Sequence, residues 1–221
     1  MIKALVFDFD GLIIDTETPE FHVWQDIYRE HGYDFPAEKW ASIVGGAGHS
    51  DFDAAEHLVL LSEGRLDSTS LRDSNRIRSG ELIHTLEPLP GVVDYLNAAK
   101  RLGLKLAIAS SSPRTWVEPH ARRIGVYSFF DEVITREDVE PGRTKPNPDL
   151  FLKALERLGV SSKAAIVFED SPNGVKAARR AGIYVVAVPN ELTSTLSLDE
   201  ANLIVSSLSE MPLPVLLDKV K

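Results

Sequence analysis

The sequence predicts an α/β fold whose core is a doubly wound parallel sheet and whose second part is a small inserted domain of α-helices. Short apolar runs alternate with amphipathic segments over most of the chain, which is the pattern of buried strands connected by helices. Glycines end several amphipathic segments just before the next apolar run, as they do at helix C-termini. The alternation is missing from residues 17–87, where no strand is predicted.

Four apolar runs are the predicted strands of the sheet. They are short, almost wholly apolar and bounded by turn residues, which is typical of parallel strands covered by helices on both faces. The runs are Ile2–Phe7, Leu104–Ala109, Ala164–Phe168 and Ile183–Val188.

The helices between these strands are marked at both ends. Their predicted C-terminal glycines follow basic residues, which suit the negative end of a helix, and are Gly103, Gly125, Gly159 and Gly182. Their predicted N-termini place a capping side chain before a proline, at Ser112-Pro113, Asn147-Pro148 and Ser171-Pro172. This alternation predicts a Rossmann-like core with right-handed crossovers, which binds its ligands beyond the carboxyl ends of the strands.

Residues 17–87 are predicted to form a helical cap domain, and residues 1–16 together with 88–221 the core. A helix opens at Thr18-Pro19 and carries Phe21, Trp24 and Tyr28 at helical spacing, which suits a small apolar core. The stretches near residues 51–61 and 71–86 also have helical patterns. Because the insertion follows the first strand, we expect the cap to lie over the carboxyl edge of the sheet.

Composition excludes several classes of partner. A net charge of -9 and a pI near 5.2 argue against binding to nucleic acid or to an anionic membrane. The absence of cysteine and of an apolar leader at the N-terminus predicts a cytoplasmic protein. A small molecule is therefore the expected partner, and the sequence leaves the oligomeric state open, with a monomer compatible.

Two carboxylates follow the first predicted strand. Residues two apart on a strand face the same side, so Asp8 and Asp10 are expected to address one site. A hard cation such as Mg²⁺ compensates carboxylates that lie close together. The alternative is a pair of aspartates that only stabilises the turn at Gly11.

Polar residues also follow other strands of the predicted sheet. Ser110 follows the second run, Glu169 and Asp170 follow the third, and Lys145 stands in the loop before the Asn147 helix. Each has an ordinary explanation by itself, as a turn residue, a helix-end carboxylate or a solvated lysine. Their shared place at one edge predicts a pocket for a phosphoryl group and a metal.

Taken together, these segments resemble the four motifs of the haloacid dehalogenase-like hydrolase superfamily. The segments are Asp8-Phe-Asp10-Gly-Leu-Ile-Ile-Asp15-Thr16, Ser110, Lys145-Pro146 and Glu169-Asp170-Ser171. The insertion resembles the helical cap of the beta-phosphoglucomutase-like branch. The resemblance implies a magnesium-dependent phosphatase that acts on a small phosphomonoester, such as a sugar phosphate.

The resemblance also implies a role for each motif residue. Asp8 is the nucleophile that forms an aspartyl-phosphate, and Asp10 is the general acid and base. Mg²⁺ is held by the Asp8 carboxylate, the backbone carbonyl of Asp10 and the Asp170 side chain, with Glu169 nearby or bound through water. Ser110 and Lys145 hold the phosphoryl oxygens.

The cap bears on the choice between a phosphatase and a phosphomutase. In the phosphomutases of this branch, a histidine follows the first motif and an arginine follows the cap-loop glycine. Here Glu20 stands at the first position and the loop Val44–His49 has no arginine, so a phosphatase is expected and a phosphomutase is the alternative. A non-catalytic binding protein is disfavoured because the nucleophile and the metal acids are all present. Candidate substrate contacts are Gly11, Thr16, Glu20, Gly46, His49, Arg72, Ser111 and Asn147.

Overall fold

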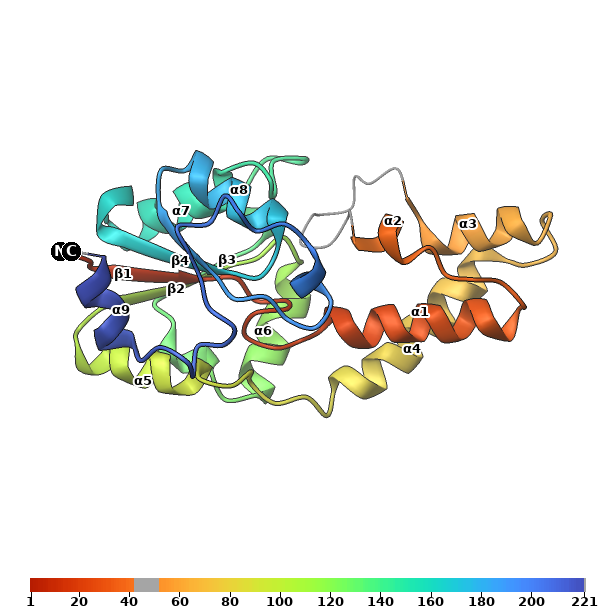
Figure 1. Ribbon diagram of the computed structural model, residues 1–221, viewed down its shortest axis with the longest axis horizontal. Coiled ribbons are helices and arrows are strands. Elements are labelled where there is room, and N and C mark those ends of the chain that lie inside the picture. The colour runs from red at the N-terminus through yellow and green to blue at the C-terminus, as the bar shows by residue number, and fades with distance from the viewer. Residues whose placement is uncertain (42–51, 221) are drawn as a thin grey trace.

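The computed structural model describes residues 1–41 and 52–220 of the chain (Figure 1). In these residues one parallel sheet has six strands in the order β3-β2-β1-β4-β5-β6. The strands are β1 (Ala4–Phe7), β2 (Lys105–Ala109), β3 (Glu132–Ile134), β4 (Ala165–Glu169), β5 (Tyr184–Ala187) and β6 (Leu203–Ile204). The sheet confirms the predicted α/β fold with a doubly wound, Rossmann-like core.

The four predicted runs are strands β1, β2, β4 and β5, with bounds that differ from the predicted ones by at most two residues. β3 and β6 were not predicted. They have three and two residues and are partly exposed, so no apolar run marks them in the sequence. β1 lies in the middle of the sheet, where Val6 pairs with Ala107 on one side and Val167 on the other.

Helices cover both faces of the sheet (Figure 1). The core helices are α5 (Val92–Arg101), α6 (Arg114–Arg123), α7 (Asp149–Leu158), α8 (Pro172–Arg180) and α9 (Leu213–Lys219). Leu5 and Phe7 of β1 share an apolar cluster with α5, α6 and α9, whereas Ala4 and Val6 share one with α7 and α8. Alternate residues of β1 are therefore buried on opposite faces.

The helix ends follow the predictions in part. The four predicted C-terminal glycines have φ between 64° and 75°, the left-handed region in which glycine avoids the strain of a side chain. Ser171 caps α8 by accepting a hydrogen bond from the amide of Gly174 at 3.1 Å. The predicted caps at Ser112 and Asn147 are wrong, because α6 and α7 have no side-chain cap and these two side chains bind elsewhere.

Four helices in the described part of the inserted segment lie beyond the carboxyl ends of the strands (Figure 1). They are α1 (Glu17–Glu30), α2 (Ala37–Ala41), α3 (Ala54–Leu61) and α4 (Ser68–Ile83). Trp24, Tyr28, Leu58 and Leu71 belong to an apolar cluster of their own, separate from the two clusters of the sheet. The aromatic residues of α1 therefore serve mainly to pack these helices together.

Short 3₁₀ turns complete the described chain. They are η1 (Tyr127–Phe129), η2 (Arg136–Asp138), η3 (Ser162–Ala164) and η4 (Thr193–Thr195). Among the described residues, every helix is too short or too polar to cross a lipid bilayer.

Candidate active site

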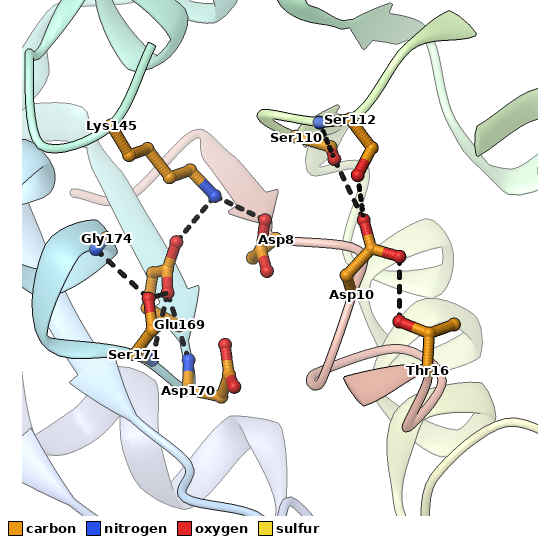
Figure 2. Close-up of polar contacts among 10 residues, drawn as sticks. All are labelled: Asp8, Asp10, Thr16, Ser110, Ser112, Lys145, Glu169, Asp170, Ser171 and Gly174. Carbon is orange, nitrogen blue, oxygen red and sulfur yellow. Dashed lines mark hydrogen bonds and ion pairs between the residues drawn. The ribbon is translucent and has the colours of Figure 1, made fainter. Parts of the chain in front are cut away.

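The motif residues meet at the carboxyl edge of the sheet (Figure 2). Asp8 directly follows β1, and its amide still donates to the carbonyl of Phe168 in β4 at 3.0 Å. Ser110 directly follows β2 and is held in the same way, by its amide and the carbonyl of Ile134 at 3.0 Å. Parallel pairing therefore carries both side chains to one edge, as the sequence predicts.

Asp8, Lys145 and Glu169 form a buried ionic group. Their exposed fractions are 5%, 3% and 0%. The Lys145 ammonium is paired with the Asp8 carboxylate and lies 2.6 Å from Oε1 of Glu169. Although burial opposes its charge, these two carboxylates raise the pKa of Lys145, so the side chain is an ammonium at neutral pH.

The backbone at the start of α8 holds Glu169 in place. Its Oε2 accepts hydrogen bonds from the amides of Asp170 and Ser171 at 3.1 and 3.2 Å and from the Ser171 hydroxyl at 3.1 Å. A Cβ on Gly174 would lie 1.8 Å from the Glu169 carboxylate. Glycine at this position therefore lets the carboxylate lie against the first turn of the helix, whose amides favour a negative charge.

Three acids form a candidate metal centre. One carboxylate oxygen from each of Asp8, Glu169 and Asp170 lies within 4.8 Å of the others, and all three residues are buried. Burial raises the pKa of Asp8 to about 8, against the effect of Lys145, and it also raises the pKa of Asp170 well above its usual value. Ionised, the three carboxylates (-3) and Lys145 (+1) leave a net charge of -2.

This donor set fits a divalent cation. Oδ1 of Asp170 is buried and accepts no hydrogen bond from the described residues, so a lone pair is available there. All the donors are carboxylate oxygens, which Mg²⁺ prefers, and its charge of +2 balances the cluster. The predicted ligands Asp8, Glu169 and Asp170 are therefore brought together, whereas the side chain of Asp10 points to other partners (Figure 2).

Asn190, in the loop after β5, joins the first and last motifs. Its side-chain amide donates to Oδ2 of Asp170 at 2.9 Å and to the carbonyl of Gly11 at 3.2 Å. Gly11 has φ of 82°, and a Cβ there would lie 2.3 Å from Oδ2 of Asp170. The close approach of the Asp170 carboxylate thus requires glycine at position 11, and the expected contact of Gly11 with a substrate stays a prediction.

Asp10 has a different environment from Asp8. Its Oδ1 accepts hydrogen bonds from the Thr16 hydroxyl at 2.8 Å and the Trp116 indole at 2.7 Å. Its Oδ2 accepts from the hydroxyls of Ser112 at 2.7 Å and Ser110 at 3.2 Å. Figure 2 shows this carboxylate turned toward the serines and Thr16. β1 ends at Phe7, so Asp10 lies in the turn beyond the strand.

Two other predicted residues lie near Asp10. Glu20 of α1 is half-buried, and burial, with a smaller effect of Asp10, raises its pKa to about 7. Ser111 stands between the two serines that bind Asp10, and its buried hydroxyl has no hydrogen-bond partner in the described chain. Both positions are compatible with contact to a substrate.

The remaining predicted substrate residues are placed differently. Arg72 forms ion pairs with Asp53 at 2.8 Å and Glu56 at 2.7 Å, so its guanidinium is used within the inserted helices. The Asn147 amide donates to the carbonyls of Gly142 and Thr144 at 3.1 Å each, and so shapes the loop that carries Lys145. Gly46 and His49 lie outside the described residues.

Sequence reasoning missed three residues of the site: Ser112, Trp116 and Asn190. The pattern Ser112-Pro113 predicts a helix cap, although the run of serines after β2 is also a signal for the pocket. Asn190 follows a predicted strand, and the rule that ligands bind at the carboxyl edge could have included it. Trp116 lies in the first turn of α6 and carries no comparable signal.

Comparison with known proteins agrees with this geometry. A family model described as haloacid dehalogenase-like hydrolase matches residues 2–182. A protein named "Putative phosphatase YhcW" from Bacillus subtilis (strain 168) is 45% identical over 219 residues, which are 99% of this chain and 97% of that protein. The "Phosphorylated carbohydrates phosphatase" of Thermotoga maritima is 31% identical over 205 residues, or 90% and 91% of the two chains.

A solved structure shows the same fold. The beta-phosphoglucomutase of Clostridium difficile has a TM-score of 0.76 and 23% identity, with 100% of this chain and 97% of that chain covered. The family match and the phosphatase relatives confirm the prediction of a hydrolase of the phosphatase type. The chain belongs to the haloacid dehalogenase-like hydrolase family.

Proposed function

We propose that this protein is a magnesium-dependent phosphatase that hydrolyses a small phosphomonoester through an aspartyl-phosphate on Asp8. The observation that carries the proposal is the buried Asp8 carboxylate, which is paired with an ammonium and lies beside two further acids at the carboxyl edge of the sheet. A nucleophilic carboxylate needs cationic surroundings, because a phosphate ester is itself an anion. Lys145 supplies one cation, and the acid cluster suits a second.

In the first step, an oxygen of Asp8 attacks phosphorus and the bond from phosphorus to the ester oxygen breaks. The leaving oxygen takes the bonding electron pair and a proton from the Asp10 carboxyl, and departs as an alcohol. Ser110 and Lys145 bind the phosphoryl oxygens and stabilise the charge that they carry in the transition state. Asp10 is held beside Ser110 at the start of this step.

In the second step, water attacks the phosphorus of the aspartyl-phosphate. The ionised Asp10 takes a proton from the water, the bond from phosphorus to Asp8 breaks, and inorganic phosphate is released with both aspartates restored. Asp8, Glu169 and Asp170 would hold Mg²⁺, together with the backbone carbonyl of Asp10. When bound, the metal supplies positive charge that allows the carboxylates and the phosphate to share one pocket.

We further propose that residues 17–87 act as a cap domain and that the substrate is a sugar phosphate or a similar metabolite. The relative from Thermotoga maritima is named for phosphorylated carbohydrates, which supports this class. The net charge of -9 disfavours nucleic acid and membranes as partners. A cytoplasmic location stays a prediction.

A panel of phosphate esters tests the function. We expect phosphate release from sugar phosphates that requires Mg²⁺ and stops with a chelator. An added alcohol acceptor should divide the product between phosphate and a new ester in the same ratio for every substrate, because all substrates give one phosphoenzyme. A ratio that changes with the leaving group would contradict a common intermediate.

A phosphomutase is the second candidate, suggested by the fold shared with beta-phosphoglucomutase. Glu20 argues against it, because its carboxyl lies near Asp10 and, once ionised above a pH of about 7, repels the second phosphate that a mutase must hold. The test supplies beta-glucose 1-phosphate with a trace of the bisphosphate and follows glucose 6-phosphate and free phosphate. Isomerisation much faster than release would favour the mutase and leave the Asp8 chemistry unchanged.

A further inference from the structure

We propose that Trp116 is a positioning residue that sets the orientation of the Asp10 carboxyl for proton transfer to the leaving group. The proposal rests on the proposed role of Asp10 as general acid. Trp116 belongs to α6 and binds the Asp10 carboxyl, so it would act through Asp10. Its contact is the hydrogen bond of 2.7 Å from the indole nitrogen to Oδ1.

The chemistry of the indole distinguishes Trp116 from the other partners of Asp10. The hydroxyls of Thr16, Ser110 and Ser112 can donate or accept, so they can follow Asp10 through a change of protonation. The indole nitrogen can only donate and does not exchange its proton with a carboxylate. Trp116 therefore restricts Oδ1 to the role of acceptor and contributes orientation without taking part in proton transfer.

This restriction identifies the oxygen that carries the catalytic proton. Oδ1 faces Thr16 and Trp116, whereas Oδ2 faces Ser110 and Ser112, where the phosphoryl group is expected to bind. A proton on Oδ1 would meet the indole N–H, and two donors cannot share a hydrogen bond. The geometry points to Oδ2 as the oxygen that gives the proton to the leaving group.

The indole ring is itself held by its helix. Trp116, His120 and Arg123 follow one another at a spacing of four and three residues, so they lie on one side of α6. The rings of Trp116 and His120 are 4.3 Å apart. Arg123 donates to the carbonyls of Leu86 at 2.8 Å and Ile83 at 3.1 Å, which anchors α6 to the segment where α4 ends. Asp10 thus receives its orientation from a rigid element.

Two esters that differ in their need for a proton test the proposal. An alkyl ester such as glucose 6-phosphate needs the general acid, whereas 4-nitrophenyl phosphate releases a stable phenolate without it. In Trp116→Phe, we expect kcat/KM for the alkyl ester to fall about 10- to 30-fold and that for 4-nitrophenyl phosphate to fall less than about threefold, since general acid catalysis contributes roughly 10²–10⁴. An equal fall for both esters, or none, would overturn the proposal.

A second replacement guards against poor folding of Trp116→Phe. Benzothienylalanine at position 116 keeps the shape of the indole and replaces the N–H by sulfur, so it removes the hydrogen bond and little else. It should give the same selective loss on the alkyl ester. Full activity with this residue would show that the ring packs against Asp10 without positioning it.

Two controls separate this inference from the proposed function. Trp40→Phe makes the same change at a buried indole whose nitrogen has no partner in the described chain, and it should leave the ratio of the two esters unchanged. Asp10→Asn should lose activity on the alkyl ester and keep most of its activity on 4-nitrophenyl phosphate. If Asp10→Asn shows no such selectivity, the general-acid role fails; if it does and Trp116→Phe does not, only the positioning role fails.

Discussion

The two aspartates of the first motif lie two residues apart and have opposite surroundings. Asp8 is buried and paired with the ammonium of Lys145, next to two more acids. Asp10 is more exposed and is bound by three hydroxyls and an indole, all of which are neutral. Asp8 thus depends on full charges, and Asp10 on neutral hydrogen-bond donors.

This difference matches the work proposed for each carboxyl. A nucleophile must be ionised when it attacks, and a nearby cation stabilises the ionised form even in a buried site. A general acid and base must exist in both protonation states within one cycle. Hydroxyl partners accept either state at little cost, because they reverse their hydrogen bonds. The contrast can be tested from each side.

The largest effect is expected for Asp8→Asn. The variant keeps the shape of the side chain but loses the nucleophile, so turnover of every ester should fall by more than about 10⁴-fold, the range seen for loss of an activated nucleophile. Rates with 4-nitrophenyl phosphate and thermal melting measure activity and folding together. Near-normal turnover by a well-folded variant would contradict covalent catalysis.

Removal of a proposed metal ligand should have the next largest effect. We expect Mg²⁺ to raise the Tm of the wild type by about 5–10 °C, the shift for a ligand near 100 times its Kd, and to leave Asp170→Asn unaffected. Because burial raises the pKa of Asp8 to about 8, Mg²⁺ must displace protons, and its affinity should increase with pH up to about that value.

Calorimetry in two buffers of different ionisation enthalpy measures the protons released on Mg²⁺ binding. Asp149→Asn is a matched control, since this aspartate pairs with the exposed Arg143, 2.9 Å away, and the variant should bind Mg²⁺ normally. Binding to Asp170→Asn with unchanged affinity would place the metal elsewhere.

The two serines that bind Asp10 should differ in how their loss affects the two classes of ester. Ser110→Ala removes a proposed phosphoryl contact and should lower kcat/KM for both alkyl and 4-nitrophenyl esters by roughly 10²-fold. Ser112→Ala removes only the hydrogen bond from the Ser112 hydroxyl to Asp10. It should therefore lower kcat/KM for the alkyl ester about tenfold and leave kcat/KM for 4-nitrophenyl phosphate nearly unchanged. If both variants lose activity on the two esters in the same ratio, the two serines do not have the different roles proposed for them.

The smallest effect is expected for Glu20→Gln. Burial, with a contribution from Asp10, raises the pKa of Glu20 to about 7, so the folded state binds its proton more tightly than the unfolded state. Stability from this group is complete below its unfolded pKa and is lost as pH rises through about 7. As pH rises, the free energy of unfolding of the variant should therefore increase by roughly 1 kcal/mol relative to that of the wild type. This is less than the free energy that corresponds to the whole pKa shift, because the side chain is half-buried.

Unfolding curves of the wild type and Glu20→Gln at about pH 5 and about pH 8 measure this difference. Glu38→Gln, an exposed change at the start of α2, serves as the control. Its difference from the wild type in the free energy of unfolding should be the same at both pH values. A constant difference between Glu20→Gln and the wild type would mean that Glu20 keeps its ordinary titration.

Burial on both faces made the central strands predictable. Such strands have continuous apolar runs, and the acids that end those runs stand out as chemistry-bearing residues. β3 and β6 escaped prediction because pairing with a longer neighbour stabilises them more than their own sequences do.

Local signals failed where a distant partner competed for a side chain. Ser112 before Pro113 has the pattern of a helix cap, yet its hydroxyl binds Asp10, 102 residues earlier. Trp116 looks like an ordinary residue of an amphipathic helix, and only the fold brings its nitrogen to Asp10. Asn190 is joined to Gly11 across 179 residues. Contacts of this range leave no periodic trace in a single sequence.

The central place of β1 has a consequence for synthesis of the protein. Val6 pairs with Ala107 and with Val167, so β1 leaves the ribosome before its partners, which lie 101 and 161 residues behind it. Contacts of such sequence separation form slowly, and an unpaired apolar strand attracts other chains. We therefore expect nascent chains to be at greatest risk of aggregation until β4 has emerged, and the carboxylates of Asp8, Glu169 and Asp170 to come together only after that.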